Sequence, residues 1–462
     1  MSQIAPSISG GGEVTAALGT WLAELQPDDI PDKVFKHIKL CILDAIGCGL
    51  YGAAQPWGRI TAEVATELSP QGRANLFGVE RTASMVDVAL ANGTAVHGFE
   101  IDDVHVSSSY HPGAVTLPVC LAVASEQRPN GRAFLTAMIA GYEIGLRLGV
   151  CAGTTHSTSG YHVTGTVGSV GGAAAAAKLL GLDAGGATNA LGIGATQAAG
   201  LYAARIGAMA KRFHAGRAAQ SGVIAGLLAR RGFTGSRDAL EAPFGGFLTT
   251  LNGQHPAETM LEDLGVRWET LQVGFKVYAS CASSHTTVDA LHQLMRQGLT
   301  PENLARLEIR MSRKGAKNVG WAYTPREVVS AQMNGFYVAA VTLIDGETFV
   351  DQFQEDRLAD PRIMALIERI EILHDPELDA GGAAKRHAVH VEAELLDGRR
   401  LKTFVEQRRG SAQHPLSQEE IVDKFVSLVK RTPVGDRAEE IVGLVMDLEK
   451  SPDILPLLQA VA

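Results

Sequence analysis

The stretch from Thr164 to Gly200 most constrains how this 462-residue chain can fold, because it is unusually rich in glycine and alanine. Five consecutive alanines, Ala173 to Ala177, precede the motif Lys-Leu-Leu-Gly. Small side chains let helices approach closely, so the stretch predicts a tightly packed, buried helical centre. A low-complexity segment is the alternative. Large apolar side chains within the stretch favour packed helices: Leu179, Leu180, Leu182, Leu191 and Ile193.

The apolar pattern changes once along the chain. From about Glu13 to Arg231 apolar residues recur at helical spacing. After about Val266 they alternate with charged residues, notably at 307–311 and 389–395, which indicates half-buried strands. Helices are expected among these strands, so the later region is predicted to be an α/β domain.

A helical pattern returns near Leu416. Ser417 and Glu420 have the spacing of a capping box, which predicts a helix start. A chain of this length exceeds one ordinary core, so two domains are expected. The predicted fold is mainly α, with a large helical domain formed by both chain ends and a smaller α/β lid domain. The predicted limits are residues 1–266 with 406–462 for the helical domain, and 267–405 for the lid.

Composition and charge narrow the function classes. The net charge is −9 and no lysine or arginine block is present, so nucleic acid is not an expected partner. A polyanionic substrate would need a local cationic site in this acidic chain. The N-terminus lacks the pattern of a signal peptide, and no stretch is a convincing membrane span. Five scattered cysteines are typical of a reduced protein, so we expect a cytoplasmic location.

The densest polar cluster lies between residues 97 and 111. Charged groups at this density are costly to bury unless they serve a site. A solvated loop with helix caps is the alternative, because charged groups are mostly exposed. The same residue types bind metals, although the cluster has no recognised metal signature. Its three imidazoles and three carboxylates are His97, His105, His111, Glu100, Asp102 and Asp103.

His162 lies just before a predicted helix N-terminus, in the motif Gly-Tyr-His-Val-Thr-Gly. Free N–H groups at such an end favour a bound anion, which supports a functional role. A structural hydrogen bond is the alternative. The glycines that follow are spaced GxxGxxG, with no strand before them and no acidic residue about twenty positions later. This pattern excludes the dinucleotide-binding fingerprint.

A third cluster places Lys211, Arg212, His214 and Arg217 within seven residues. Four potential cations in an acidic chain predict a local site for carboxylate groups. A solvated basic helix face is the alternative, although the apolar flanks favour partial burial.

Two weaker candidates come from the α/β region. Lys276 lies in Gly-Phe-Lys-Val-Tyr, with Cys281 and His285 nearby, and Tyr337 lies in Asn-Gly-Phe-Tyr-Val. Taken alone, each of the two is more typical of a structural residue.

The motifs of the chain, and the order in which they occur, resemble those of the MmgE/PrpD family. The matching blocks are HGFEIDDVH with a following HPGA, GYHVTGTVG, KRFHAGRAAQSG, FYVAAVTLIDG and GSAQHPLS, and they cover nearly the whole chain. The family includes 2-methylcitrate dehydratases, cis-aconitate decarboxylases and an iminodisuccinate epimerase. The resemblance implies a helical domain with an α/β lid, a homodimer, and an active site between the domains.

The resemblance also implies a set of site residues. Glu100 stands where the family usually has Asp, and Val104 where the decarboxylase has Thr. An insertion at 107–110 lengthens the loop before His111. The family's decarboxylase site maps onto Glu100, Val104, His111, His162, Lys211, Lys276 and Tyr337.

All three family reactions create carbanion-like charge beside a carboxylate, which nearby cations stabilise. We expect lysines to supply that charge and histidines to move protons. Tyr337 would deliver a proton or hydrogen-bond a leaving hydroxyl, and an aspartate would orient a histidine. The catalytic candidates are His111, His162, Lys211, Tyr337 and Asp103; the substrate-binding candidates are Glu100, Asp102, Arg212, His214 and Lys276.

The expected function is a cofactor-independent lyase acting on a small di- or tricarboxylic acid, with no metal. A 2-methylcitrate dehydratase-like hydro-lyase is preferred as the family's namesake activity, and an epimerase or a decarboxylase is the alternative. Outside the family, the alternatives are a non-catalytic carboxylate-binding protein and a metal-dependent hydrolase. The hydrolase would use His97, Asp102, His105 and His111.

Overall fold

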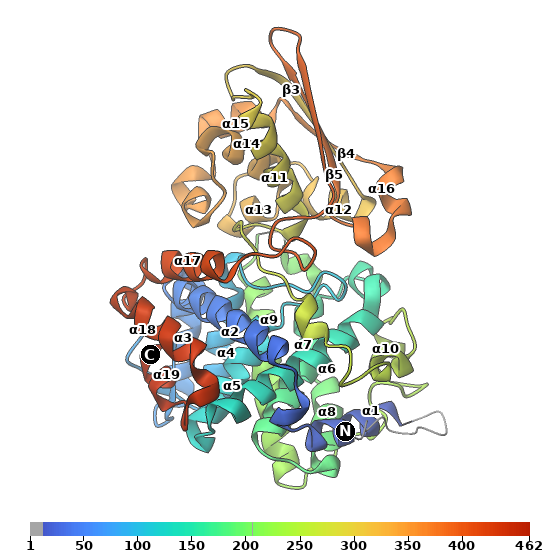
Figure 1. Cartoon of the computed structure of the whole chain (residues 1–462), viewed down its shortest axis with the longest axis vertical. Coiled ribbons are helices and arrows are strands. Elements are labelled where there is room, and N and C mark those ends of the chain that lie inside the picture. The colour runs from blue at the N-terminus through green and yellow to red at the C-terminus, as the bar shows by residue number, and fades with distance from the viewer. Residues whose placement is uncertain (1–12, 206) are drawn as a thin grey trace.

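The computed structural model describes residues 13–205 and 207–462, which form two lobes (Figure 1). The larger, helical lobe contains both ends of the described chain. Its helices are α1 (Val14–Glu24), α2 (Asp32–Ala53), α3 (Pro56–Leu68), α4 (Met85–Val96), α5 (Gly113–Gln127), α6 (Gly131–Thr158), α7 (Val163–Leu179), α8 (Ala184–Ala195), α9 (Ala210–Arg230), α10 (Phe247–Thr250), α17 (Gln418–Val429), α18 (Ala438–Met446) and α19 (Leu455–Ala460). A two-residue strand pair, β1 (Ala74–Asn75) and β2 (Thr82–Ala83), lies between α3 and α4.

The smaller lobe, called the lid lobe below, is built from a four-stranded sheet and short helices. Its elements are α11 (Ala282–Arg296), β3 (Leu304–Met311), α12 (Arg313–Val319), α13 (Val328–Gln332), α14 (Gly335–Asp345), α15 (Pro361–Ile367), β4 (Ile370–His374), α16 (Pro376–Ala380), β5 (Val389–Leu395) and β6 (Arg400–Val405). The mainly α fold with a small α/β part is therefore confirmed. The exact domain limits at residues 266 and 406 stay a prediction.

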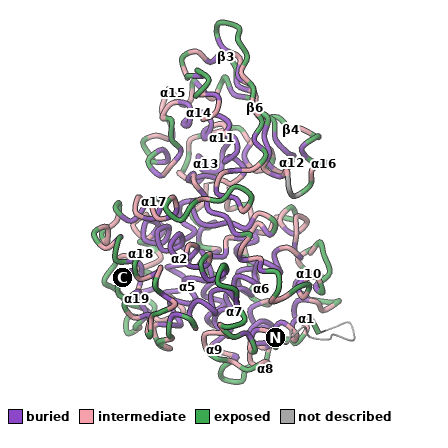
Figure 2. The backbone as a smooth tube through the Cα atoms, in the orientation of Figure 1, coloured by how far each residue is buried: buried purple, intermediate pink, exposed green. Residues whose placement is uncertain are grey.

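The glycine- and alanine-rich stretch forms α7 and α8, and α7 lies at the centre of the helical lobe. Every residue from Val163 to Ala177 is buried, and Figure 2 shows the central helices mostly in the colour of buried residues. Helix α7 packs against α6 and α9. A Cβ built on Gly222 of α9 would lie 2.5 Å from the carbonyl carbon of Gly172. Close packing therefore requires small residues here, and the predicted buried centre is confirmed.

The sheet of the lid lobe has the strand order β4-β3-β5-β6. Strand β3 pairs parallel to β4 and antiparallel to β5, and β5 pairs antiparallel to β6. The alternating residues predicted to be buried are buried, among them Leu307 and Ile309 of β3. Helices α11 and α14 pack against the strands, which explains why one face is apolar.

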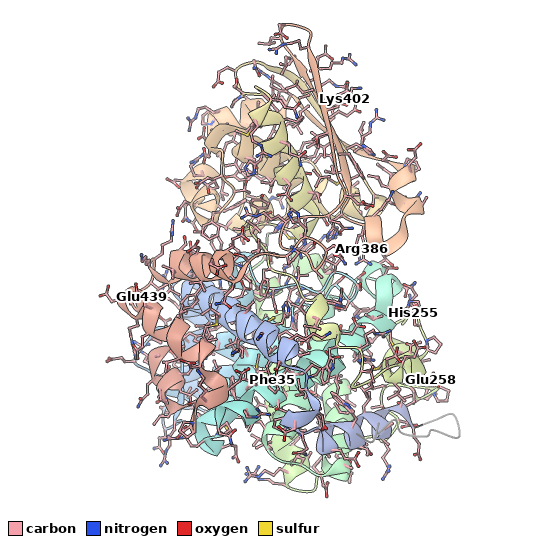
Figure 3. The ribbon with its side chains drawn as sticks, in the orientation of Figure 1. Phe35, His255, Glu258, Arg386, Lys402 and Glu439 are labelled. Atoms are coloured by element: carbon pink, nitrogen blue, oxygen red, sulfur yellow. The ribbon has the colours of Figure 1, made fainter. Side chains whose placement is uncertain are left out.

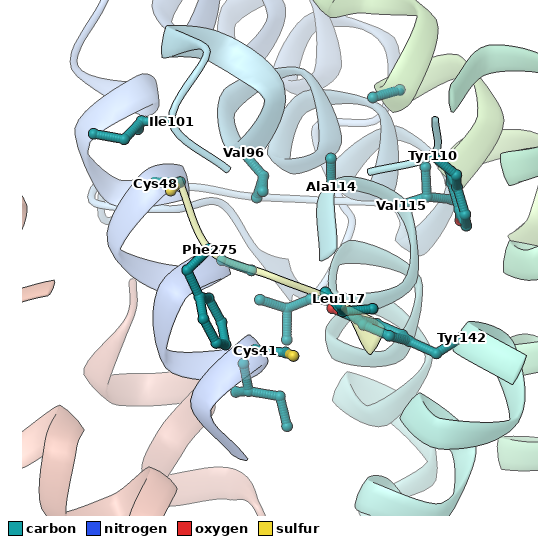
Figure 4. Packing of buried hydrophobic residues seen from close by; sticks show 14 of the residues in the cluster. Cys41, Cys48, Val96, Ile101, Tyr110, Ala114, Val115, Leu117, Tyr142 and Phe275 are labelled. Atoms are coloured by element: carbon teal, nitrogen blue, oxygen red, sulfur yellow. The ribbon is translucent and has the colours of Figure 1, made fainter. Parts of the chain in front are cut away.

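The chain enters the lid lobe through an extended segment that is anchored in the helical lobe. Phe275 of this segment lies 5.6 Å, centroid to centroid, from His37 of α2. Figure 4 shows its ring within the buried apolar cluster that includes Cys41 and Leu117. The lid lobe therefore starts from a fixed point in the helical core.

The C-terminal helices return to the helical lobe, as the sequence predicts. The side chain of Ser417 accepts a hydrogen bond from the Glu420 amide, which confirms the capping box at the start of α17. The Nζ atom of Lys424 donates to Oδ1 of Asp44 in α2 over 2.5 Å and to the carbonyl oxygen of Ile101 over 2.6 Å. This lysine thus ties α17 to α2 and to the segment that follows α4.

By length and composition, α6 could cross a membrane, and the bent pair α2 and α3 could do so if it were one span. In the described chain, 94% of the apolar window of α6 is buried inside the structure. Burial of this extent is typical of the core helix of a globular fold.

Replacement of Lys424 by Met should destabilise the protein strongly. The change leaves Asp44 buried without its charged partner, which costs about 3–5 kcal/mol in comparable buried pairs. Lys450→Met is the matched control, because Lys450 pairs with Asp447 while both side chains are exposed. That exposed pair should contribute little to stability, because water screens both charges. Denaturant unfolding of the three proteins measures the difference, and equal stability of the two variants would contradict the role of Lys424.

Candidate active site

A cavity of about 930 Å³ lies where the two lobes meet, and both lobes contribute to its wall. Figure 3 labels Arg386, a residue of the lid lobe that lines this cavity. Among the described residues, seven lysine or arginine side chains and two carboxylates line it. They are Arg205, Lys211, Lys276, Arg313, Lys314, Lys317 and Arg386, with Glu100 and Asp379. The cavity is thus locally cationic in a chain whose net charge is −9, which suits a polyanionic ligand.

The floor of the cavity is formed by the segment after α4. It begins with a short 3-10 helix, η2 (His97–Phe99), which ends at Glu100 in the left-handed conformation, with φ +56°. Such a conformation costs a non-glycine residue about 1–3 kcal/mol and persists only where neighbours enforce it. A strained, buried glutamate at this position is typical of a functional site.

Three side chains from different elements hold this segment in place. Gln332 of α13 donates to the carbonyl oxygen of Phe99 over 2.7 Å, and Lys276 donates to that of Glu100 over 3.0 Å. Lys424 donates to the next carbonyl, as described above. Three consecutive carbonyl groups therefore receive hydrogen bonds from the lid lobe, the crossing segment and the C-terminal helices.

Asp102 joins two histidines of the cluster. Its Oδ2 atom lies 2.7 Å from Nδ1 of His97 and 3.2 Å from Nδ1 of His111. Burial alone would raise the pKa of Asp102, but the two imidazoles more than offset this effect and hold it well below its usual value. An ionised Asp102 accepts a hydrogen bond from Nδ1–H of His97 and lies within ion-pair distance of His111, so Nε2 of each ring is directed to other partners.

Lys211 and Lys276 share the carboxylate of Glu100. Lys211 is hydrogen-bonded to Oε1, and Nζ of Lys276 lies 3.5 Å from Oε2. Nζ of Lys211 also lies 3.3 Å from Nε2 of His97. Burial would raise the pKa of Glu100, but the two lysines lower it, so that this carboxylate stays ionised. Two lysine ammonium groups are thus fixed side by side at the cavity wall.

His162 lies at the N-terminal end of α7 and faces the cavity. Its ring stacks on that of His97, with 5.4 Å between centroids, and its Nδ1 atom lies 3.0 Å from Nδ1 of His214. Burial, and then the nearby Lys211, lowers the pKa of His162 well below its usual value. His162 is therefore neutral near pH 7, with one ring nitrogen available to accept a hydrogen bond.

The structure brings together six of the seven residues mapped by resemblance. The six that line the cavity are Glu100, Val104, His111, His162, Lys211 and Lys276. Asp102 and His214 lie behind them, each in contact with a histidine of the cavity.

Three other predicted site residues point elsewhere. Asp103 accepts hydrogen bonds from the Tyr142 hydroxyl over 2.8 Å and from the Gly113 amide over 3.0 Å, so its carboxylate is occupied in fixing α5 and α6. The Arg212 guanidinium stacks 3.7 Å from the Trp57 ring and donates to the Gly98 carbonyl. The Tyr337 hydroxyl donates to the carbonyl oxygen of Gln352 over 2.9 Å. These contacts indicate positioning roles, and direct catalytic or binding roles for the three stay predictions.

The donor set proposed for a metal is only partly assembled. Ligand atoms of His97, Asp102 and His111 lie within 4.8 Å of one another. His105 is turned away: its Nδ1 atom lies 2.8 Å from the Ser108 hydroxyl. Two lysine ammonium groups lie beside the three remaining groups, 3.3 Å from His97 and 3.9 Å from Asp102. Their positive charge disfavours a divalent cation at this position, so the residues fit a metal poorly.

Sequence reasoning missed the cations that the lid lobe contributes, chiefly Lys314 and Arg386. For Lys314, one feature of the chain could have indicated a functional role. Arg313 and Lys314 occupy the first turn of α12, where the helix dipole disfavours positive charge. Two cations in such a place suggest that something other than helix stability keeps them there.

The environment of His97 should make it titrate abnormally. Burial, opposed by Asp102 and reinforced by Lys211, lowers its pKa to about 4. Nitrogen NMR of histidine-labelled protein, with His97→Gln to assign the signal, should show His97 neutral until about that pH. Since an unfolded histidine titrates near 6.5, this residue reduces the free energy of unfolding as pH falls from about 6.5 towards 4, by up to about 1.4 kcal/mol per unit. A midpoint near 6.5 would contradict the geometry of the cluster.

Comparison with known proteins places this site in a family. The model of the MmgE/PrpD N-terminal domain matches residues 16–259, and that of the C-terminal domain matches residues 278–450. The chain is 32% identical to a cis-aconitate decarboxylase-like protein of Aspergillus oryzae, over 98% of both chains. It is also 32% identical to a cis-aconitate decarboxylase of Aspergillus terreus, over 96% of this chain and 95% of the relative.

A mitochondrial 2-methylcitrate dehydratase of Yarrowia lipolytica is more distant. It is 23% identical, over 73% of this chain and 68% of the relative. The matched regions of the two domain models cover most of both lobes and five of the six mapped cavity residues, all but Lys276. This chain therefore belongs to the MmgE/PrpD family.

Proposed function

We propose that the chain is a lyase that removes carbon dioxide from a small unsaturated tricarboxylate of the cis-aconitate type. The cationic cavity carries this proposal, because seven lysine and arginine side chains line it against two carboxylates. Two relatives at 32% identity, one named a cis-aconitate decarboxylase and the other a cis-aconitate decarboxylase-like protein, support a decarboxylation. The sequence alone favoured a dehydratase, but the dehydratase relative is only 23% identical.

Lys211 and Lys276 would bind the carboxylate that is retained next to the double bond. When the bond between carbon and the departing carboxyl group breaks, its electron pair spreads through the double bond into that retained carboxylate. Ammonium groups fixed in a cavity stabilise this charge more strongly than water does, because they need no reorganisation. Glu100 keeps the lysines in place before the substrate arrives.

The carbanion then needs a proton. His111 is placed to deliver it from Nε2–H, because His111 lines the cavity and its Nδ1 atom faces the carboxylate of Asp102, which orients the ring. The products would be carbon dioxide and an unsaturated dicarboxylate, and water would return the proton to His111. Positioned proton transfer of this kind contributes about 10²–10⁴-fold to the rate.

Dehydration of a hydroxy-tricarboxylate is a second candidate, supported by the neutral His162. A dehydratase needs a base for the proton next to a carboxylate, and a neutral imidazole is suited to that task. The same lysines would stabilise the enolate-like charge. The hydroxyl would then leave as water after gaining a proton.

The reaction is tested by proton NMR in deuterated water with cis-aconitate, citrate and 2-methylcitrate as substrates. Decarboxylation predicts loss of one carboxyl group from cis-aconitate and one deuterium in the product, at the carbon next to the retained carboxylate that accepts the electron pair. A new alkene from 2-methylcitrate, without carbon dioxide, would show the dehydratase instead. No change with any of the three would mean that the proposed substrate class is wrong.

Replacement of His111 by Gln should lower kcat by about 100-fold or more while the protein stays folded, because the proton donor is lost. His255→Gln is the matched control, since His255 lines the cavity at an exposed position. That variant should keep kcat close to the wild-type value. If His111→Gln also retains it, the proposed proton donor is incorrect.

A further inference from the structure

Two cations on the lid side of the cavity have no carboxylate partner in the described part of the chain. Arg386 is 8% exposed and Lys314 is half-buried, and no carboxylate oxygen lies within 4 Å of either charged group. Arg313, the neighbouring cation on α12, does have a carboxylate partner: its Nε atom lies 3.8 Å from Oδ2 of Asp379. Cations removed from water without an opposite charge are costly, so an anion would stabilise this pair.

The two cations converge on one hydroxyl group. Nη1 of Arg386 donates to Oγ of Ser109 over 3.2 Å and to the carbonyl oxygen of Val106 over 2.6 Å. Nζ of Lys314 donates to the same Oγ over 3.4 Å. Burial, and then Arg386, lowers the pKa of Lys314 to about 7. The three side chains therefore form a small, preorganised group of donors that faces the cavity.

This group is distinct from Lys211 and Lys276, which contact Glu100. Lys211 and Lys276 belong to the floor, whereas Lys314 and Arg386 belong to the lid lobe, and all four line the same cavity. Apolar side chains such as Val104 and Met333 line it as well. A ligand that satisfies both groups must carry carboxylates at two separate positions.

We propose that Lys314, Arg386 and Ser109 form a second carboxylate subsite, which receives the central carboxylate of the substrate, the retained one that Lys211 and Lys276 do not bind. The proposal rests on the proposed function, since it assumes that the cavity binds the substrate. It assigns the selection of tricarboxylates over dicarboxylates to the lid lobe. It also gives a role to the loop at residues 107–110, which supplies Ser109.

Calorimetric titration tests the subsite without turnover, using propane-1,2,3-tricarboxylate and pentanedioate, which lacks the central carboxylate. Wild-type protein should bind the tricarboxylate at least about tenfold more tightly, as expected for one charge-assisted contact. Lys314→Gln should lose about tenfold for the tricarboxylate and little for pentanedioate. Lys314→Arg should keep the preference, because it keeps the charge.

Lys317→Gln is the matched control, since it removes one charge from the same helix at an exposed position of the cavity rim. It should weaken both ligands slightly and equally, because exposed charges are screened. Equal weakening of both ligands by Lys314→Gln, unchanged binding in that variant, or no tricarboxylate preference in the wild type would each overturn the subsite.

The outcomes separate the subsite from the reaction. If Lys314 governs the preference but cis-aconitate is not decarboxylated, the subsite stands and the proposed reaction fails. If carbon dioxide is released and Lys314→Gln changes neither binding nor KM, the reaction stands and the subsite fails.

Discussion

The buried carboxylate of Glu100 is the interaction on which the site depends. Two charged lysines held side by side in a protein interior are costly unless an anion compensates them. Glu100 supplies that anion, and the lysines in turn keep it ionised. The attraction and the cost of burial are each several kcal/mol and oppose one another, so the cluster contributes to placement more than to stability. Its result is a cationic surface that exists before substrate binds.

The fold supplies the restraints that this cluster requires. The carbonyl groups of Phe99, Glu100 and Ile101 are bound by side chains from α13, the crossing segment and α17. The backbone strain at Glu100 is therefore opposed from three directions. Because the C-terminal helices return to the helical lobe, Lys424 of α17 can bind the Ile101 carbonyl. This arrangement also couples the positions of the two lobes to the shape of the cavity floor.

Much of the fold could be predicted from the sequence, because it depends on local patterns. The small residues of α7 and the alternation in β3 and β5 each indicate one structure. The clusters at His97–His111 and at His162 could also be recognised, because charged groups at this density are costly to bury unless they serve a site. The relations between them could not. Asp103 turns away from the histidines because Tyr142 of α6 and the amide of Gly113 in α5 bind its carboxylate. The sequence around Asp103 does not show these two contacts.

The cations of the lid lobe were harder still to predict. Lys314 and Arg386 lie far apart in the sequence and meet only because α12 and the segment before β5 both contribute to the cavity wall. Arg212 shows the opposite case: its motif is basic, but the side chain turns to Trp57. A motif gives the residue types of a site, whereas the packing of helices decides which side chains face it.

A crystal structure of the protein with propane-1,2,3-tricarboxylate bound would test the cavity directly. The predicted result is one carboxylate hydrogen-bonded to Lys211 and Lys276, another to Lys314 and Arg386, and the carbon chain beside His111 and His162. A ligand bound outside the cavity, or within it without contact to either pair of cations, would contradict the assignment of this cavity as a polycarboxylate site.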